Sequence, residues 1–187
     1  MSEPLEPWEQ LREEPLVRYK AFDVRRSWRR SPRTGAEIGF FLIDTWNWVN
    51  IVAITDRDEI LLVRQYRHGT QEFTIEVPGG LLDPGEDDPI QAAARELREE
   101  TGYKHGELRL LGVTRPNPAI FSNKLSTYLA TDCVLDGELA MDAGEDIEVI
   151  HVPITELDEM LCRGEIDHSL VLASLHLFRL KGAAVDG

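Results

Sequence analysis

The fold of this chain is constrained most by one well-marked helix that lies between two groups of short strands. The helix is predicted over residues 89–101, because Asp88 is a good N-cap, Pro89 suits the first helical turn and Gly102 favours a helix end. Strands are predicted at 38–45, 49–55, 60–66, 73–77, 108–114, 125–131 and 148–152, and further helices at 155–163 and 169–181. This order predicts an α/β/α or α+β sandwich with a mixed sheet.

The first 35 residues are predicted to form a β-rich arm, and residues 36–187 the main domain. Residues 16–30 are rich in Val, Tyr, Phe and Trp, and a turn signal follows at 31–35. The arm has a local basic excess, with one acid, Asp23, among Arg18, Lys20, Arg25, Arg26, Arg29, Arg30 and Arg33. Two interpretations stay open: the arm reaches a second subunit and helps to hold an anionic substrate, or it balances the protein's own acidic surface.

Charge and cysteine content exclude several function classes. The 187 residues include 34 Asp and Glu against 20 Lys and Arg, a formal net charge of −14, which repels nucleic acid and anionic membranes. Two cysteines, Cys133 and Cys162, are too few for a disulfide framework. No apolar run approaches the length of a membrane span, and the acidic start is wrong for a signal peptide. We therefore expect a soluble cytoplasmic protein.

Three glutamates mark the 89–101 helix as the candidate site. Glu96 and Glu100 are four residues apart and share one helix face, with Glu99 beside them. Carboxylates placed in this way repel unless a cation lies among them, and hard oxygen ligands suit Mg²⁺ or Mn²⁺ shared with substrate phosphates. The glycine-rich turn before the helix lets backbone groups approach such an ion closely. The alternative is a solvated acidic helix face.

The segment that contains this helix resembles the signature of the Nudix hydrolases, G-x5-E-x7-R-E-U-x-E-E-x-G-U, in which U is apolar. The matching positions are Gly80, Glu86, Arg95, Glu96, Leu97, Glu99, Glu100, Gly102 and Tyr103. The chain departs from it once, because eight residues, Asp87 to Ala94, separate Glu86 from Arg95 where the family has seven. We place the extra residue in the Asp87–Asp88 loop, where the helical register survives, and expect Arg95 to pair with Glu86.

Several other stretches resemble the branch of the family that cleaves ADP-ribose and related nucleoside diphosphate sugars. They are Trp48–Ile54, Leu62–Arg67, Glu76–Gly80 and Asn117–Ala119, and Pro118 lies 16 residues beyond Gly102. The resemblance implies the Nudix fold and a homodimer. It also implies a metal-dependent cleavage of a small nucleotide sugar, ADP-ribose first and GDP-mannose second, into a nucleoside monophosphate and a sugar phosphate. A nucleoside triphosphate pyrophosphatase and a non-catalytic nucleotide-sugar sensor are the alternatives.

The resemblance also implies roles for individual residues. The metal ligands would be the Gly79 carbonyl with Glu96, Glu99, Glu100 and Glu145, the last from the 142–148 loop as either ligand or general base. The catalytic residues would be Glu145, Glu99 and Arg95. The substrate would contact Arg67, Asn117, Trp46 and Leu81.

Three of the substrate residues have a plainer alternative. In these alternatives, Arg67 only pairs with an acid across the sheet, Asn117 only forms a turn beside Pro118, and Trp46 belongs to the core or an interface. Trp28 and Trp48 are weaker candidates for stacking on a base. His105, His151, His168 and His176 have no ligand spacing and are expected to be structural or exposed.

Overall fold

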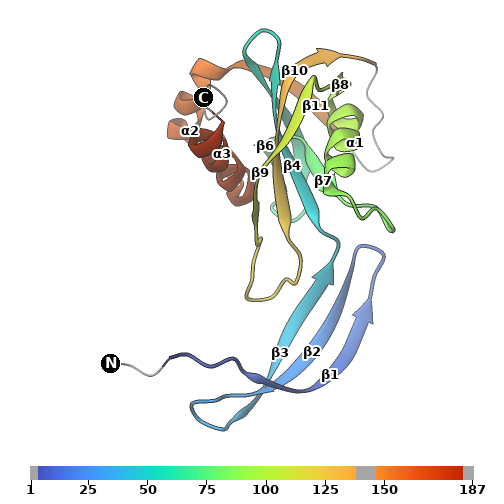
Figure 1. The fold of residues 1–187 in the computed structure, drawn as a ribbon, viewed down its shortest axis with the longest axis vertical. Coiled ribbons are helices and arrows are strands. Elements are labelled where there is room, and N and C mark those ends of the chain that lie inside the picture. Colours follow the sequence, from blue (N-terminus) through green and yellow to red (C-terminus); the bar gives the residue numbers. More distant parts are fainter. Residues whose placement is uncertain (1–3, 138–145, 183–187) are drawn as a thin grey trace. The chain divides into compact units, whose positions relative to one another are not determined.

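Two units make up the computed structural model, which describes residues 4–137 and 146–182. The N-terminal unit consists of Met1–Trp46 and Arg115–Asn123, and the larger unit of Asn47–Thr114 and Lys124–Gly187. Each unit contains its own β-sheet (Figure 1). The first unit therefore takes in the third strand and an internal segment in addition to residues 1–35.

The N-terminal unit is a three-stranded antiparallel sheet in the order β1-β2-β3. Its strands are β1 (Glu9–Arg18), β2 (Phe22–Arg30) and β3 (Glu37–Thr45). The stretch at 16–30, which leans towards strand by its composition, contains the end of β1 and all of β2, and the two strands are separated at 19–21. The internal segment joins the sheet through Ile43, whose N–H donates to the Ile120 carbonyl at 2.8 Å and whose carbonyl accepts from Ser122 N–H at 3.2 Å.

The larger unit has an eight-stranded sheet with the central order β11-β5-β4-β10-β8. Its strands are β4 (Trp48–Thr55), β5 (Glu59–Arg67), β6 (Glu72–Glu76), β7 (Gly79–Leu81), β8 (Tyr103–Lys104), β9 (Glu107–Thr114), β10 (Leu125–Leu135) and β11 (Ile147–Pro153). β4 and β10 run parallel, and the other pairs are antiparallel. The sheet is therefore mixed, as predicted.

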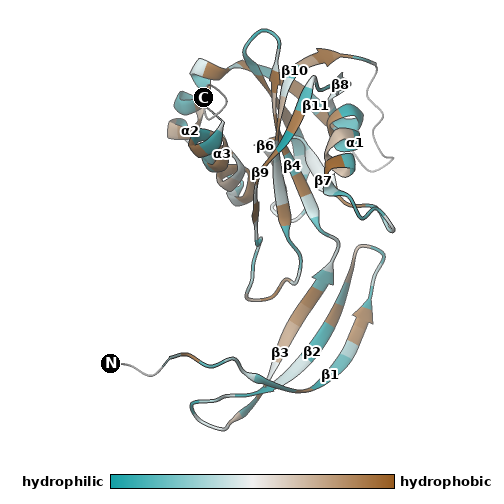
Figure 2. Cartoon of the chain, in the orientation of Figure 1, coloured by the Kyte–Doolittle hydropathy of each residue, from teal (hydrophilic) through white to brown (hydrophobic). Residues whose placement is uncertain are grey.

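Helices cover both faces of this sheet (Figure 1). They are α1 (Pro89–Thr101), α2 (Leu157–Arg163) and α3 (Ser169–Lys181), with a 3₁₀ turn at Ile154–Glu156. Successive β4 side chains point to opposite faces, so Ile51 packs in the core beneath α1 and Val52 in the core beneath α2 and α3. The central strands carry hydrophobic stretches, coloured brown in Figure 2, which contribute to both cores. The predicted α/β/α sandwich is confirmed.

The helix ends match the sequence signals closely. α1 and α3 have the predicted bounds, whereas the segment predicted as helix from 155 is a 3₁₀ turn until α2 begins at Leu157.

Among the described residues, no helix is long and apolar enough to cross a membrane.

Candidate active site

Helix α1 is fixed at both ends by local backbone contacts. The Asp88 carboxylate accepts a hydrogen bond from Ile90 N–H at 3.1 Å, and Gly102 closes the helix with φ 74°, donating to the Arg98 carbonyl at 2.8 Å. The buried side chains of Ala93 and Leu97 hold one helix face on the sheet. This register turns Glu96 and Glu100 toward β7.

The two glycines of β7 come close enough to touch these carboxylates. Gly79 N–H donates to Glu100 Oε2 at 2.8 Å, and a Cβ at Gly80 would lie 2.5 Å from Glu96 Oε1. A Cβ at Gly79 would clash with the Val49 carbonyl oxygen. Glycine at both positions therefore allows the backbone to meet the carboxylates. Glu100 is only 4% exposed, so this predicted ligand is buried and does not lie on a solvated helix face.

Arg95 connects the loop before α1 to the carboxylates on the helix. Its guanidinium donates to Glu86 Oε2 at 3.2 Å, Glu96 Oε1 at 2.9 Å and Glu99 Oε2 at 2.8 Å. It also donates to the Leu81 carbonyl at 3.1 Å. Burial alone lowers the pKa of Arg95, but the surrounding carboxylates outweigh burial and raise it. The predicted pairing with Glu86 is present, and the extra loop residue does not disturb it.

The donors at this site fit a hard divalent cation. The Glu96 and Glu100 carboxylates meet the Gly79–Gly80 backbone, and carboxylate oxygens are ligands that a hard divalent cation prefers. Within residues 4–137 and 146–182, no three His, Cys, Asp or Glu side chains form a metal site by themselves. Glu145, the predicted further ligand or base, lies outside the described residues.

Arg67 makes the contact that was named as its alternative. Its Nε and Nη2 donate to the two oxygens of Glu76 at 2.6 and 2.7 Å, although 44% of the arginine side chain remains exposed. Leu81, also predicted to bind substrate, is 41% exposed and uses its carbonyl to hold Arg95. Both residues thus lie in the unit that contains α1.

Asn117 and Trp46 belong to the N-terminal unit. Asn117 forms a turn, with its carbonyl accepting from Phe121 N–H at 2.8 Å and its Oδ1 from Ala119 N–H at 3.3 Å. Trp46 exposes 43% of its surface, and its carbonyl accepts from Asn123 Nδ2 at 3.1 Å. Turn formation, the alternative given for Asn117, is present in the structure.

Several basic residues of the arm have acidic partners within the N-terminal unit. Arg25 pairs with Asp44 and Glu13, and Arg30 pairs with Glu9 and Glu37. Trp28 stacks on arginines of the same sheet, with Arg12 Cζ at 4.3 Å and Arg26 Cζ at 4.4 Å from the ring centroid. These acidic partners lie on β1 and β3, outside residues 18–33, in which basic residues outnumber acidic ones. These contacts support the second interpretation, in which the basic residues balance acidic residues of the protein itself, here within the N-terminal unit.

Three residues beside Arg67 were not singled out from the sequence. Glu76 is buried, accepts from Thr74 Oγ1 at 2.6 Å and lies 3.3 Å from His168 Nδ1. The available signal was a carboxylate at the end of an apolar strand, directly before Val77, where a charged side chain is rarely buried without a partner. No spacing rule connects Glu76 to His168, since α3 is far along the chain.

This chain is similar to known proteins over most of its length. A NUDIX domain model matches residues 46–174. The ADP-ribose pyrophosphatase of Mycobacterium tuberculosis is 32% identical over 169 residues, which cover 90% of this chain and 81% of that protein. The ADP compounds hydrolase NudE of Escherichia coli is 31% identical over 161 residues, 85% of this chain and 80% of the relative. A crystal structure of an ADP compounds hydrolase superposes with a TM-score of 0.83 at 27% identity, covering 97% of this chain and 98% of that one.

Proposed function

The chain belongs to the Nudix family, and on that premise we propose that it is a pyrophosphohydrolase that cleaves a nucleoside diphosphate sugar into a nucleoside monophosphate and a sugar phosphate. The observation that carries the proposal is the meeting of Glu96 and Glu100 with the β7 backbone. ADP-ribose is the first candidate, because an ADP-ribose pyrophosphatase and an ADP compounds hydrolase are similar to most of the chain. GDP-mannose is the second.

The proposed metal is Mg²⁺, with Mn²⁺ as the alternative. Glu96, Glu100 and the Gly79 carbonyl would hold it, with Glu99 beside them, and Glu145 is proposed as a further ligand or the general base. When bound, the ion supplies neutralisation of phosphoryl charge and a more acidic water. Arg95 keeps the Glu96 and Glu99 carboxylates oriented, and Gly79 N–H holds Glu100.

The substrate side is proposed to use Arg67, Leu81, Asn117 and Trp46. A planar guanidinium fork suits the oxygens of a diphosphate, and 44% of the Arg67 side chain is accessible to it.

The two cysteines, Cys133 and Cys162, are unpaired, which supports the proposed cytoplasmic location.

A substrate panel tests the proposed activity. The protein is incubated with ADP-ribose, GDP-mannose, ADP-glucose, NADH and nucleoside triphosphates, each with Mg²⁺ and with a chelator, and phosphate is measured after coupling to a phosphatase. We expect turnover of one or two diphosphate sugars that the chelator abolishes. Turnover that persists in chelator contradicts the metal site, whereas no turnover of any substrate by the folded protein favours a sensor.

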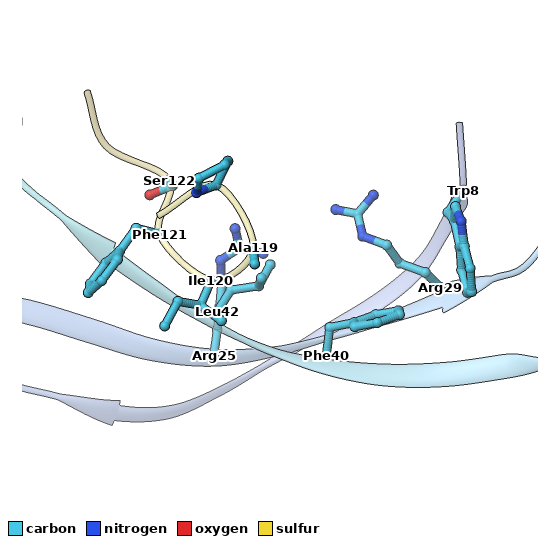
Figure 3. A pocket seen from close by; sticks show the side chains of 10 residues that line it. Trp8, Arg25, Arg29, Phe40, Leu42, Ala119, Ile120, Phe121 and Ser122 are labelled. Carbon is cyan, nitrogen blue, oxygen red and sulfur yellow. The ribbon is translucent and has the colours of Figure 1, made fainter. Parts of the chain in front are cut away.

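We also propose that the N-terminal unit mediates a homodimer. Its sheet presents a cavity of about 580 Å³ lined by Trp8, Phe40, Leu42, two arginines and the 118–122 segment (Figure 3). Trp8 and Phe40 meet edge to face with ring centroids 5.5 Å apart, and both remain more than a third exposed. An exposed aromatic surface of this kind suits an interface with a second copy of the chain.

Phe40→Arg tests the dimer. We expect the wild type to have twice the chain mass of 21.2 kDa by light scattering, and the variant to be monomeric. Leu180→Arg is the matched control, because Leu180 is exposed on α3 of the larger unit. A dimeric Phe40→Arg variant would show that this face is not the interface.

A further inference from the structure

Glu76 is a buried carboxylate that the proposed mechanism does not yet use. It is the last residue of β6, only 3% exposed, and three residues before Gly79. An unpaired carboxylate in such a place would be strongly unfavourable, so its partners define what it does.

Each oxygen of this carboxylate has two polar neighbours. Oε1 accepts from Arg67 Nε and from Thr74 Oγ1, both at 2.6 Å. Oε2 accepts from Arg67 Nη2 at 2.7 Å and lies 3.3 Å from His168 Nδ1. Burial, the largest influence, raises the pKa of Glu76, but the bonds from Arg67 and Thr74 outweigh it and lower the pKa. The carboxylate is therefore ionised at neutral pH.

The consequence for Arg67 is a fixed orientation. Glu76 engages one edge of the planar guanidinium by two parallel hydrogen bonds, a geometry that fixes the plane as well as the position. Arg67 ends β5 and Glu76 ends β6, so the pair also ties together the two strands of this hairpin. With 44% of its side chain exposed, Arg67 stays accessible to a ligand.

The same segment leads directly to the metal edge of the site. After Glu76 the chain passes through Val77 and Pro78, whose carbonyl accepts from Ile51 N–H at 2.8 Å, and reaches Gly79. Only these two residues therefore separate Glu76, the anchor of Arg67, from the Gly79 backbone that meets Glu100.

We infer that Glu76 is a positioning residue for substrate binding, which holds Arg67 in the orientation that engages the anionic diphosphate sugar, while Thr74 holds Glu76 and His168 lies beside it. This inference rests on the proposed function and on the proposed role of Arg67. Positioning predicts an effect on substrate binding, because a misdirected guanidinium loses a charge-assisted contact and not the chemistry at phosphorus.

Glu76→Gln tests the inference, because glutamine keeps the volume but lacks the charge and can accept on only one side. We expect KM for the preferred diphosphate sugar to rise about tenfold with kcat within about twofold of wild type. Arg67→Lys should raise KM to a similar extent, and the double variant should resemble Arg67→Lys alone. Glu72→Gln is the matched control, because Glu72 lies opposite Arg67 in the hairpin but is exposed, and its KM should not change.

Thr74→Val gives a second measurement with no change of charge. It removes one donor to Glu76 Oε1, and we expect KM to rise about twofold to threefold. Additive effects of Glu76→Gln and Arg67→Lys, an unchanged KM, or loss of folding in both the Glu76 and Thr74 variants would overturn the inference. Failure of the wild type to hydrolyse any diphosphate would instead contradict the proposed function.

Discussion

Glu100→Gln is expected to lower kcat at least about a thousandfold while the protein keeps its fold. The substitution removes a negative charge from the proposed cation site, and such an ion supplies several kcal/mol of transition-state stabilisation. Glutamine retains an oxygen that can accept from Gly79 N–H, the contact that Glu100 makes at 2.8 Å. The buried position of Glu100 makes this retained bond the reason to expect a folded variant.

Steady-state kinetics with Mg²⁺, together with thermal unfolding, measure both parts of this expectation. Glu107→Gln serves as the control, because it makes the same change at an exposed position of β9 and should leave kcat and the unfolding midpoint unchanged. If Glu100→Gln retains full activity, α1 is not the metal site.

Arg95→Ala is expected to lower the free energy of unfolding by about 2 kcal/mol and to reduce activity strongly. The substitution leaves Glu86 and Glu96, with side chains 19% and 12% exposed, without the guanidinium between them. It also frees the Leu81 carbonyl and lets Glu96 and Glu99 repel each other. Denaturant unfolding in chelator measures the stability, and turnover with Mg²⁺ measures the activity.

Arg98→Ala is the matched control on the same helix. Arg98 pairs with Asp136 at 3.1 Å, but its side chain is 64% exposed, and exposed pairs contribute less than about 1 kcal/mol. Equal destabilisation by the two substitutions would mean that helix propensity, and not the carboxylate contacts, explains the loss in Arg95→Ala.

Features set by local sequence were predicted well. The bounds of α1 follow from Asp88, Pro89 and Gly102, which act on backbone groups within one turn. The face shared by Glu96 and Glu100 follows from helical periodicity, and the mixed sandwich from the order of elements. The expected pairing of Arg95 with Glu86 is also present.

Features set by contacts between residues far apart in the chain were not predicted. β1 was missed because its sequence is acidic and contains Pro15, which an edge strand tolerates. β7 and β8 are too short to leave a periodic pattern. The bond between Arg67 and Glu76 was anticipated only as an acid across the sheet, and the approach of His168 joins residues far apart in the chain.

The hydrogen bonds of Ile43 with the 118–122 segment have a consequence for dissecting the molecule by truncation. The N-terminal unit is discontinuous, because Arg115–Asn123 belongs to it although this segment is synthesised after α1. A fragment that stops at Trp46 lacks the partners of Ile43, and a fragment that starts at Asn47 still carries a loop whose partner strand is gone. During translation, likewise, β1, β2 and β3 emerge first, but Ile43 acquires these hydrogen bonds only after about two-thirds of the chain has been made.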